Sequence, residues 1–384
     1  MITIREPAPD VLQVSGFDPE ARPILSVLVK RTYQILPDGR ANPASEQLPL
    51  RLDIENDEDN PRRFHRDTDA YPFKVRTDVV VHGAVEGRGR PSTTASVRVG
   101  NTLKAIAVFG DRKVALTGTG RLLFSDPEPI EKIPLRYDRA YGGIDQAAHD
   151  RHGNPVEALN KYMNPPFDPF LASPYLYPRN HVGVGYLVEA TAAAVDRLVL
   201  PNLEDPADLL SPDRLVVGAS GRWPLMPIPQ SFDWVDMGTF PRLAYAGVVH
   251  DHEPLRAPVA EVARGFAPAN LLDEKPLEQQ IDARFTSGAS LGLQVPYLMG
   301  GETCQLENIH PRQQVWSFRV PAERPEIKVD GRNGTLKDTS PVIHTLEIDA
   351  EKSLVSVLWR GSAAALRPYG DEELKTMPLL VRWA

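Results

Sequence analysis

The chain has 384 residues, a formal net charge of −8 and 37 prolines, about twice the usual share of proline. Interior prolines break helices, so their scatter along the chain excludes a helical bundle, and the acidic balance gives no basis for binding nucleic acid or an anionic membrane. The single cysteine, Cys304, excludes an intrachain disulfide. No long apolar run and no signal-peptide pattern are present, so we expect a cytoplasmic protein.

Alternating apolar residues predict strands in the first third of the chain. Residues 25–35 alternate between apolar and polar side chains, which predicts a strand with one buried face, and residues 75–85 repeat this pattern. Residues 94–99 and 102–109 flank a Gly-Asn pair, and glycine first in a two-residue loop is typical of a type II′ hairpin. The charged segment 56–69 is predicted to be a surface loop.

The middle of the chain has a different composition. Residues 126–185 are rich in Pro, Gly, Asn, Tyr and Asp, with one short helix predicted at residues 156–163. A second helix is predicted at residues 187–200, where it is ended by Pro201. So much irregular chain is uncommon unless it carries a function or packs onto a partner.

The last third returns to strand patterns. Prolines cut the helical stretch 256–285 into short pieces, residues 315–320 alternate, and residues 343–348 and 353–360 frame a predicted hairpin. We therefore predict a mostly β protein of two β-sandwich-like or barrel-like lobes joined by an irregular Pro/Gly-rich segment. The predicted units are residues 1–125 (N-terminal β-rich lobe), 126–210 (middle segment with short helices) and 211–384 (C-terminal β-rich lobe).

The motifs that would indicate an enzyme are weak. His250-Asp251-His252-Glu253 contains metal-ligand types, but on a strand the two histidines would share a face while the acids point away. A solvated charged loop is the favoured interpretation, and a metal-dependent hydrolase using His250 and His252 stays as the alternative. Nucleophile elbow, dinucleotide fingerprint and phosphate loop are all missing. Cys304 is expected to be a small core residue, and no catalytic residue, metal or cofactor is predicted.

Short motifs spread over the chain are informative through their order. The most specific is Tyr137-Asp138-Arg139-Ala140-Tyr141-Gly142-Gly143. The others are residues 28–33 (LVKRTY), 77–83 (TDVVVHG), 97–112, 180–185 (NHVGVG), 200–206 (LPNLEDP), 300–308 and 358–361 (LWRG). In this order they resemble a bacterial family first catalogued as a domain of unknown function and associated with type VI secretion. His181 departs from the family pattern, which usually has proline there, and residues 240–242 follow it loosely.

The resemblance implies a non-catalytic adaptor or chaperone without a cofactor. Such a protein binds a toxic type VI secretion effector in the cytoplasm and loads it onto the valine-glycine repeat (VgrG) spike or the proline-alanine-alanine-arginine repeat (PAAR) tip. A structural component of the baseplate or spike is the remaining alternative.

We consider two hypotheses for the role of the signature residues. Their glycines can fix turns of the fold, because glycine tolerates positive φ and close chain approach. Alternatively, the Tyr- and Arg-rich middle segment forms the effector-docking surface, because aromatic residues and arginine are common interface anchors. The candidate residues are Arg136, Tyr137, Arg139, Tyr141, Gly142, Gly143, Tyr175, Tyr177, Arg179, Asn180, Gly183 and Gly185.

Overall fold

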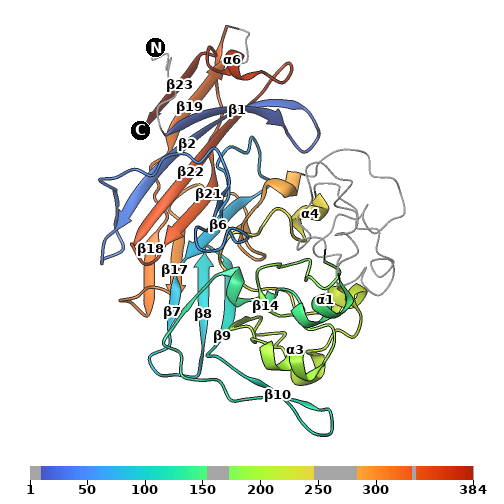
Figure 1. Cartoon of the computed structure of the whole chain (residues 1–384). Helices are drawn as coiled ribbons and strands as arrows, with labels where there is room; N and C mark the ends of the chain where they lie inside the picture. Colours follow the sequence, from blue (N-terminus) through green and yellow to red (C-terminus); the bar gives the residue numbers. More distant parts are fainter. Residues whose placement is uncertain (1–9, 154–172, 246–282, 331–333, 384) are drawn as a thin grey trace.

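A computed structural model describes residues 10–153, 173–245, 283–330 and 334–383. The protein is mostly β, as predicted, and two large sheets dominate it (Figure 1). The larger sheet has the order β1 (Val11–Phe17), β2 (Pro23–Ile35), β22 (Leu354–Ala364), β21 (Val342–Asp349), β6 (Thr77–His82) and β16 (Gln294–Val295), with β3 (Ala41–Pro43) also on β2. The five-stranded sheet has the order β15 (Leu203–Glu204), β9 (Thr102–Phe109), β8 (Ser92–Val99), β17 (Thr303–Glu307) and β18 (Val315–Arg319).

Smaller ladders and short helices complete the described part of the chain. The ladders are β4 (Glu55–Asn56) with β5 (Phe64–Arg66), β7 (Ala84–Glu86) with β12 (Lys132–Pro134), β10 (Val114–Leu116) with β11 (Leu122–Phe124), β13 (Tyr141–Gly142) with β14 (Val184–Gly185), and β19 (Pro325–Asp330) between β20 (Leu336–Asp338) and β23 (Leu379–Trp383). The α-helices are α1 (Gln146–His152), α3 (Ala192–Arg197), α4 (Arg242–Tyr245) and α6 (Asp371–Leu374), and the 3-10 helices are Tyr137–Arg139, Pro212–Arg214, Ser220–Leu225 and Ala283–Thr286.

The two predicted β-rich lobes are not separate units in the structure. β2 pairs with β22 along eleven positions, and β17 pairs with β8, so residues 1–125 and 211–384 contribute strands to both large sheets. Side chains from both sheets belong to one apolar core. Strand patterns along the sequence do not reveal which distant strands pair, so this shared pairing was not expected.

The middle segment has an apolar core of its own. Its members come mainly from residues 141–240 and include three tyrosines and Trp223. Short helices occur in this segment as predicted, but the helix expected at 187–200 is reduced to α3. Thr191 begins α3, because its hydroxyl accepts a hydrogen bond from Ala194 N–H (3.2 Å). Leu187 instead forms a bridge with Val216. The helices expected at 156–163 and in most of 256–285 lie outside the described residues.

Several strand predictions are confirmed. β8 and β9 form the expected hairpin with Gly100 at φ +55°, β21 and β22 form the second hairpin, and β18 buries Trp316 and Phe318 on one face. Two strands differ from the prediction because both of their faces are covered. In β2 the polar residues Lys30 and Thr32 are buried, and in β6 three consecutive valines are buried.

The charged segment 56–69 is partly buried, although its sequence predicted a surface loop. Arg63, Asp67 and Asp69 are each less than 5% exposed. Each of them is compensated by a charge of opposite sign: Asp69 by Lys30 (2.8 Å), Asp67 by Arg242 (2.9 Å) and Arg63 by Asp57. Burial of a charge is tolerated when it is paired in this way, and residue type alone does not show the pairing.

Candidate functional site

The two glycine motifs of the middle segment, 141–143 and 183–185, lie side by side. β13 and β14 pair in parallel, with Tyr141 opposite Val184 and Gly142 opposite Gly185. Gly143 has φ +87°, and a Cβ atom there would lie 2.2 Å from the carbonyl oxygen of Gly183. Both the backbone conformation and the close approach require glycine, so the motif fixes this crossing of the chain.

Asn180 connects the two motifs. Its side-chain amide donates hydrogen bonds to the carbonyl oxygens of Tyr137 (2.8 Å) and Tyr141 (3.1 Å), and its own carbonyl oxygen accepts one from Gly143 N–H (2.8 Å). All three contacts are made by a buried residue. The role of Asn180 in the structure is therefore to hold the signature segment in its conformation.

Two signature tyrosines, Tyr141 and Tyr177, and the neighbouring Tyr186 lie together in the core of the middle segment. Tyr177 packs edge-on against Tyr141, with ring centroids 5.1 Å apart, and lies 5.2 Å from Tyr186. The Tyr177 hydroxyl donates to Pro227 O (2.8 Å) and accepts from Arg179, whose guanidinium lies over Trp223. Burial raises the pKa of Tyr141 well above its ordinary value. These side chains contribute core packing, in agreement with the turn-fixing hypothesis.

The other candidate residues are more accessible. Arg136 is paired with Asp138 (2.7 Å), and Tyr137 and Arg139 are half-buried. Tyr175 is half-buried and stacks on His152, with ring centroids 5.7 Å apart. The set expected to form one docking surface is thus divided between the core and scattered half-exposed positions.

An open groove of about 300 Å³ lies over the signature glycines. Its lining combines glycine backbone, apolar side chains and basic or polar side chains, and contains no aspartate or glutamate. The lining residues are Asn60, Arg62, Gly142, Gly143, Ile144, His181, Val182, Gly183, Val184, Gly185, Tyr186, Arg197, Leu198 and Val199. We call this feature the glycine groove. Gly142, Gly143 and Gly185 are buried, so the accessible part of the lining comes mainly from the surrounding side chains.

A turn held by hydrogen bonds places Arg62 at the rim of the glycine groove. Asp57 accepts hydrogen bonds from Asn60 N–H (3.0 Å) and from the guanidinium of Arg63, which also lies 3.5 Å from Asp233. His181, on the opposite wall, contacts the carbonyl oxygen of Arg62 through Nε2 (2.8 Å). The exposed side chain of Arg62 is therefore attached to a fixed backbone.

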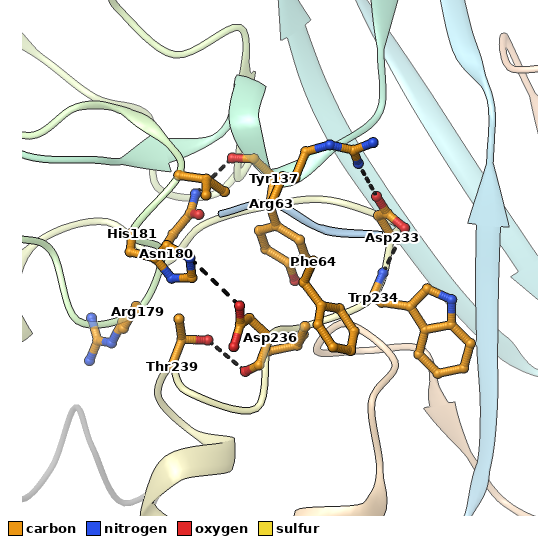
Figure 2. A pocket seen from close by; sticks show the side chains of 12 residues that line it. Arg63, Phe64, Tyr137, Arg179, Asn180, His181, Asp233, Trp234, Asp236 and Thr239 are labelled. Atoms are coloured by element: carbon orange, nitrogen blue, oxygen red, sulfur yellow. Dashed lines mark hydrogen bonds and ion pairs between the residues drawn. The ribbon is translucent and has the colours of Figure 1, made fainter. Parts of the chain in front are cut away.

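A small pocket adjoins the glycine groove and shares His181 and Val182 with it (Figure 2). Figure 2 shows Asn180 bonded to Tyr137 on one side and Asp233 paired with Arg63 on the other. The pocket volume is about 20 Å³, enough for roughly one water molecule. A substrate does not fit in this pocket, so it supports the groove wall instead of forming an active site.

A buried ion network lies next to the pocket. His82 places Nε2 3.0 Å from Glu347 and Nδ1 3.4 Å from Asp233. Burial opposes charge on the ring, but the two carboxylates outweigh it and raise the pKa of His82. Burial likewise opposes charge on Glu347, yet Arg51 and His82 hold its pKa well below the ordinary range. Both ring nitrogens of the half-buried His82 thus face carboxylates, which favours the protonated form of the ring.

Metal-ligand clusters are missing from the part of the chain that the structure describes: no three His, Cys, Asp or Glu side chains there are placed to hold an ion. His250 and His252 lie outside the described residues, so the hydrolase alternative is untested. Cys304 is fully buried in β17, as expected for a core residue, and burial raises its pKa.

A larger groove of about 760 Å³ lies elsewhere, between residues 38–43 and the edge strand β18. Charged residues at this groove pair with one another: Arg40 with Asp38 (2.6 Å), and Glu323 with Arg31 (2.7 Å). None of the candidate signature residues lines it. The glycine groove is therefore the stronger candidate site.

Other sequence motifs also meet in space. Arg112 pairs with Glu204, and the Asn202 side chain donates to Phe109 O (3.0 Å) and Asp111 (2.9 Å). Sequence reasoning missed Arg62, Arg197 and Val199 at the groove. The departure at His181 was the one available signal, because it marks the residue that touches Arg62.

The described residues thus define a mostly β protein in which the motifs at residues 137–143 and 180–185 meet at an open groove. A family model described as an uncharacterized protein conserved in bacteria (DUF2169) matches residues 20–360, so the chain belongs to this bacterial family. No curated protein and no solved structure matched the chain. Across the described ranges, no helix combines the length and apolar character needed to span a bilayer.

Proposed function

We propose that this protein is a non-catalytic adaptor that binds a type VI secretion effector in the cytoplasm and presents it to the VgrG spike or the PAAR tip. The order of short sequence motifs suggests this role, and membership of a bacterial family that matches residues 20–360 is compatible with it. The association of the family with secretion belongs to the proposal.

The observation that carries the proposal is the glycine groove. It is open, about 300 Å³ in volume, and lined by apolar side chains and two arginines, of which Arg62 has its backbone carbonyl bonded to His181. An open groove with apolar and basic side chains suits a segment of polypeptide, whereas small-molecule sites are more enclosed. Preformed walls lower the entropy lost on binding.

Affinity capture tests the proposal. The tagged protein is purified from native cells that express the secretion system, and co-purifying chains are identified by mass spectrometry. We expect a toxin-like protein together with a spike or tip protein. Recovery of neither contradicts the proposal. A stoichiometric transition metal in protein purified without added metal favours the hydrolase alternative instead.

A further inference from the structure

We infer that the glycine groove binds an extended, carboxylate-bearing segment of the partner protein, with Arg62 and Arg197 as the anion-recognising residues. This inference rests on the proposed function and adds the chemistry of the bound segment. Its basis is charge complementarity between the groove and such a segment.

The groove is locally basic on an acidic protein. The whole chain carries a net charge of −8, yet the groove lining contains Arg62, Arg197 and His181 and no acidic residue. Carboxylates reach it from outside the lining, Asp150 at Arg197 and Asp236 at His181, each at 3.6 Å. An acidic segment is therefore attracted to this groove, whereas much of the remaining surface repels it. Arginine suits the task because its planar guanidinium can bind a carboxylate through two parallel hydrogen bonds.

Arg197 can exchange its present partner for a bound carboxylate. It lies 3.6 Å from Asp150, and both side chains are more than half exposed. Exposed ion pairs of this kind contribute little to stability, so a carboxylate held in the groove can replace Asp150 at little cost. Arg62 lies across the groove on the turn that His181 holds.

The rest of the lining fits the body of an extended segment. Val199 is 53% exposed at the rim, and Val182, Val184 and Leu198 are half-buried beside it. Such positions accept apolar side chains next to the acidic one.

Charge reversal in the native cell tests the inference. Tagged wild-type protein and the Arg62→Glu/Arg197→Glu variant are compared for the amount of effector captured per adaptor. We expect a loss of at least about tenfold, because close charge pairs at interfaces commonly contribute this much. Arg62→Lys/Arg197→Lys keeps the charge and is expected to retain most of the binding.

The matched control reverses two arginines at the larger groove, Arg40→Glu and Arg319→Glu. It has the same change in net charge and is expected to capture the effector normally. Equal thermal unfolding midpoints for all variants show that folding is intact. If the control loses the effector and the groove variant does not, or if both lose it equally, the inference is wrong.

Photo-cross-linking identifies the chemistry of the bound segment. A benzoylphenylalanine at position 199 is expected to cross-link to a segment with an aspartate, a glutamate or a C-terminal carboxylate, whereas the same residue at the exposed position 366 is not. A cross-linked segment without a carboxylate overturns the inference.

If wild type still captures effector and spike while charge reversal has no effect, the inference fails and the adaptor function stands. If wild type captures neither, both fail.

Discussion

His181 Nε2 lies 2.8 Å from the carbonyl oxygen of Arg62, joining segments that are 119 positions apart in sequence. The contact spans two walls of the glycine groove and sets the position of the Arg62 backbone. His181 is only 8% exposed, so the bond is shielded from water. His181, the residue that departs from the family pattern, thus helps to fix the position of Arg62 at the groove.

Removal of this contact is expected to weaken partner binding more than folding. His181→Ala deletes the hydrogen bond to Arg62 O, which costs about 1 kcal/mol of unfolding free energy, and a longer contact of Nε2 with Asp236 (3.6 Å). His181→Gln is the control, because its amide nitrogen can take the place of Nε2. Denaturant unfolding and effector capture measure the two effects. Identical behaviour of the Ala and Gln variants would show that the contact has no role.

Gly143→Ala is expected to be severely destabilising. Its φ is +87° and the new Cβ atom would lie 2.2 Å from Gly183 O, so the backbone must move. We expect a loss of about 3 kcal/mol or more, or failure to fold. Gly120→Ala is the matched control. Gly120 has φ +80°, but no atom lies within 4 Å of the Cβ that alanine would add, so we expect a loss of only about 1 kcal/mol of unfolding free energy. Soluble yield and chemical unfolding compare them; equal losses would refute the close-approach argument.

The buried tyrosines give a prediction that separates packing from hydrogen bonding. Among the described residues, the Tyr141 and Tyr186 hydroxyls have no partner, whereas the Tyr177 hydroxyl donates to Pro227 O. Tyr141→Phe and Tyr186→Phe are therefore expected to leave stability unchanged or to raise it. Tyr177→Phe removes the donor to the buried Pro227 O and one of the acceptors of Arg179, which keeps its bonds to Pro224 O and Met226 O, and should cost about 1–3 kcal/mol. Unfolding free energies of the three variants test this; a loss for Tyr141→Phe equal to that for Tyr177→Phe contradicts it.

Lys104 is expected to make stability depend on pH. It is buried in β9, where its Nζ donates to Ser231 O (2.8 Å) and Ser290 Oγ (2.9 Å), and burial lowers its pKa from 10.5 to about 7. Between these pH values the unfolded chain binds more protons than the folded protein. Stability therefore rises with pH in this window, by up to roughly 1.4 kcal/mol per pH unit.

Lys104→Met removes this dependence and serves as the comparison. The unfolding free energy of wild type minus that of the variant is expected to increase from pH 7 to pH 9, as measured with denaturant at each pH. Contributions of other groups cancel in the difference. A difference that stays constant over this range means that Lys104 keeps its ordinary pKa.

Local patterns predicted the mostly β character, the β8–β9 and β21–β22 hairpins and the burial of Trp316, because turn residues and alternation act over a few positions. They could not predict that β2 pairs with β22, since that contact joins the two ends of the chain. The burial of Lys30 and Arg63 was missed for the same reason: their carboxylate partners are set by tertiary contacts.

In the candidate site, too, local sequence patterns predicted some features, and tertiary contacts determined the others. Gly143 and Gly185 were identified as conformationally special, and both have positive φ. The tyrosines were assigned a surface role as one hypothesis, but Tyr141 and Tyr177 face the core. Arg62 and Arg197 carry no local signal, because an exposed arginine becomes a groove residue only through the segments folded around it.

The central claim is that the protein carries an effector and is not part of the secretion machine, and a secretion assay in a deletion strain tests it most directly. The quantities measured are the effector and the spike protein released into the medium, with and without a wild-type copy of the gene. The account predicts that deletion abolishes release of the effector while the spike is still exported. Loss of spike export together with the effector would contradict it and identify a structural component.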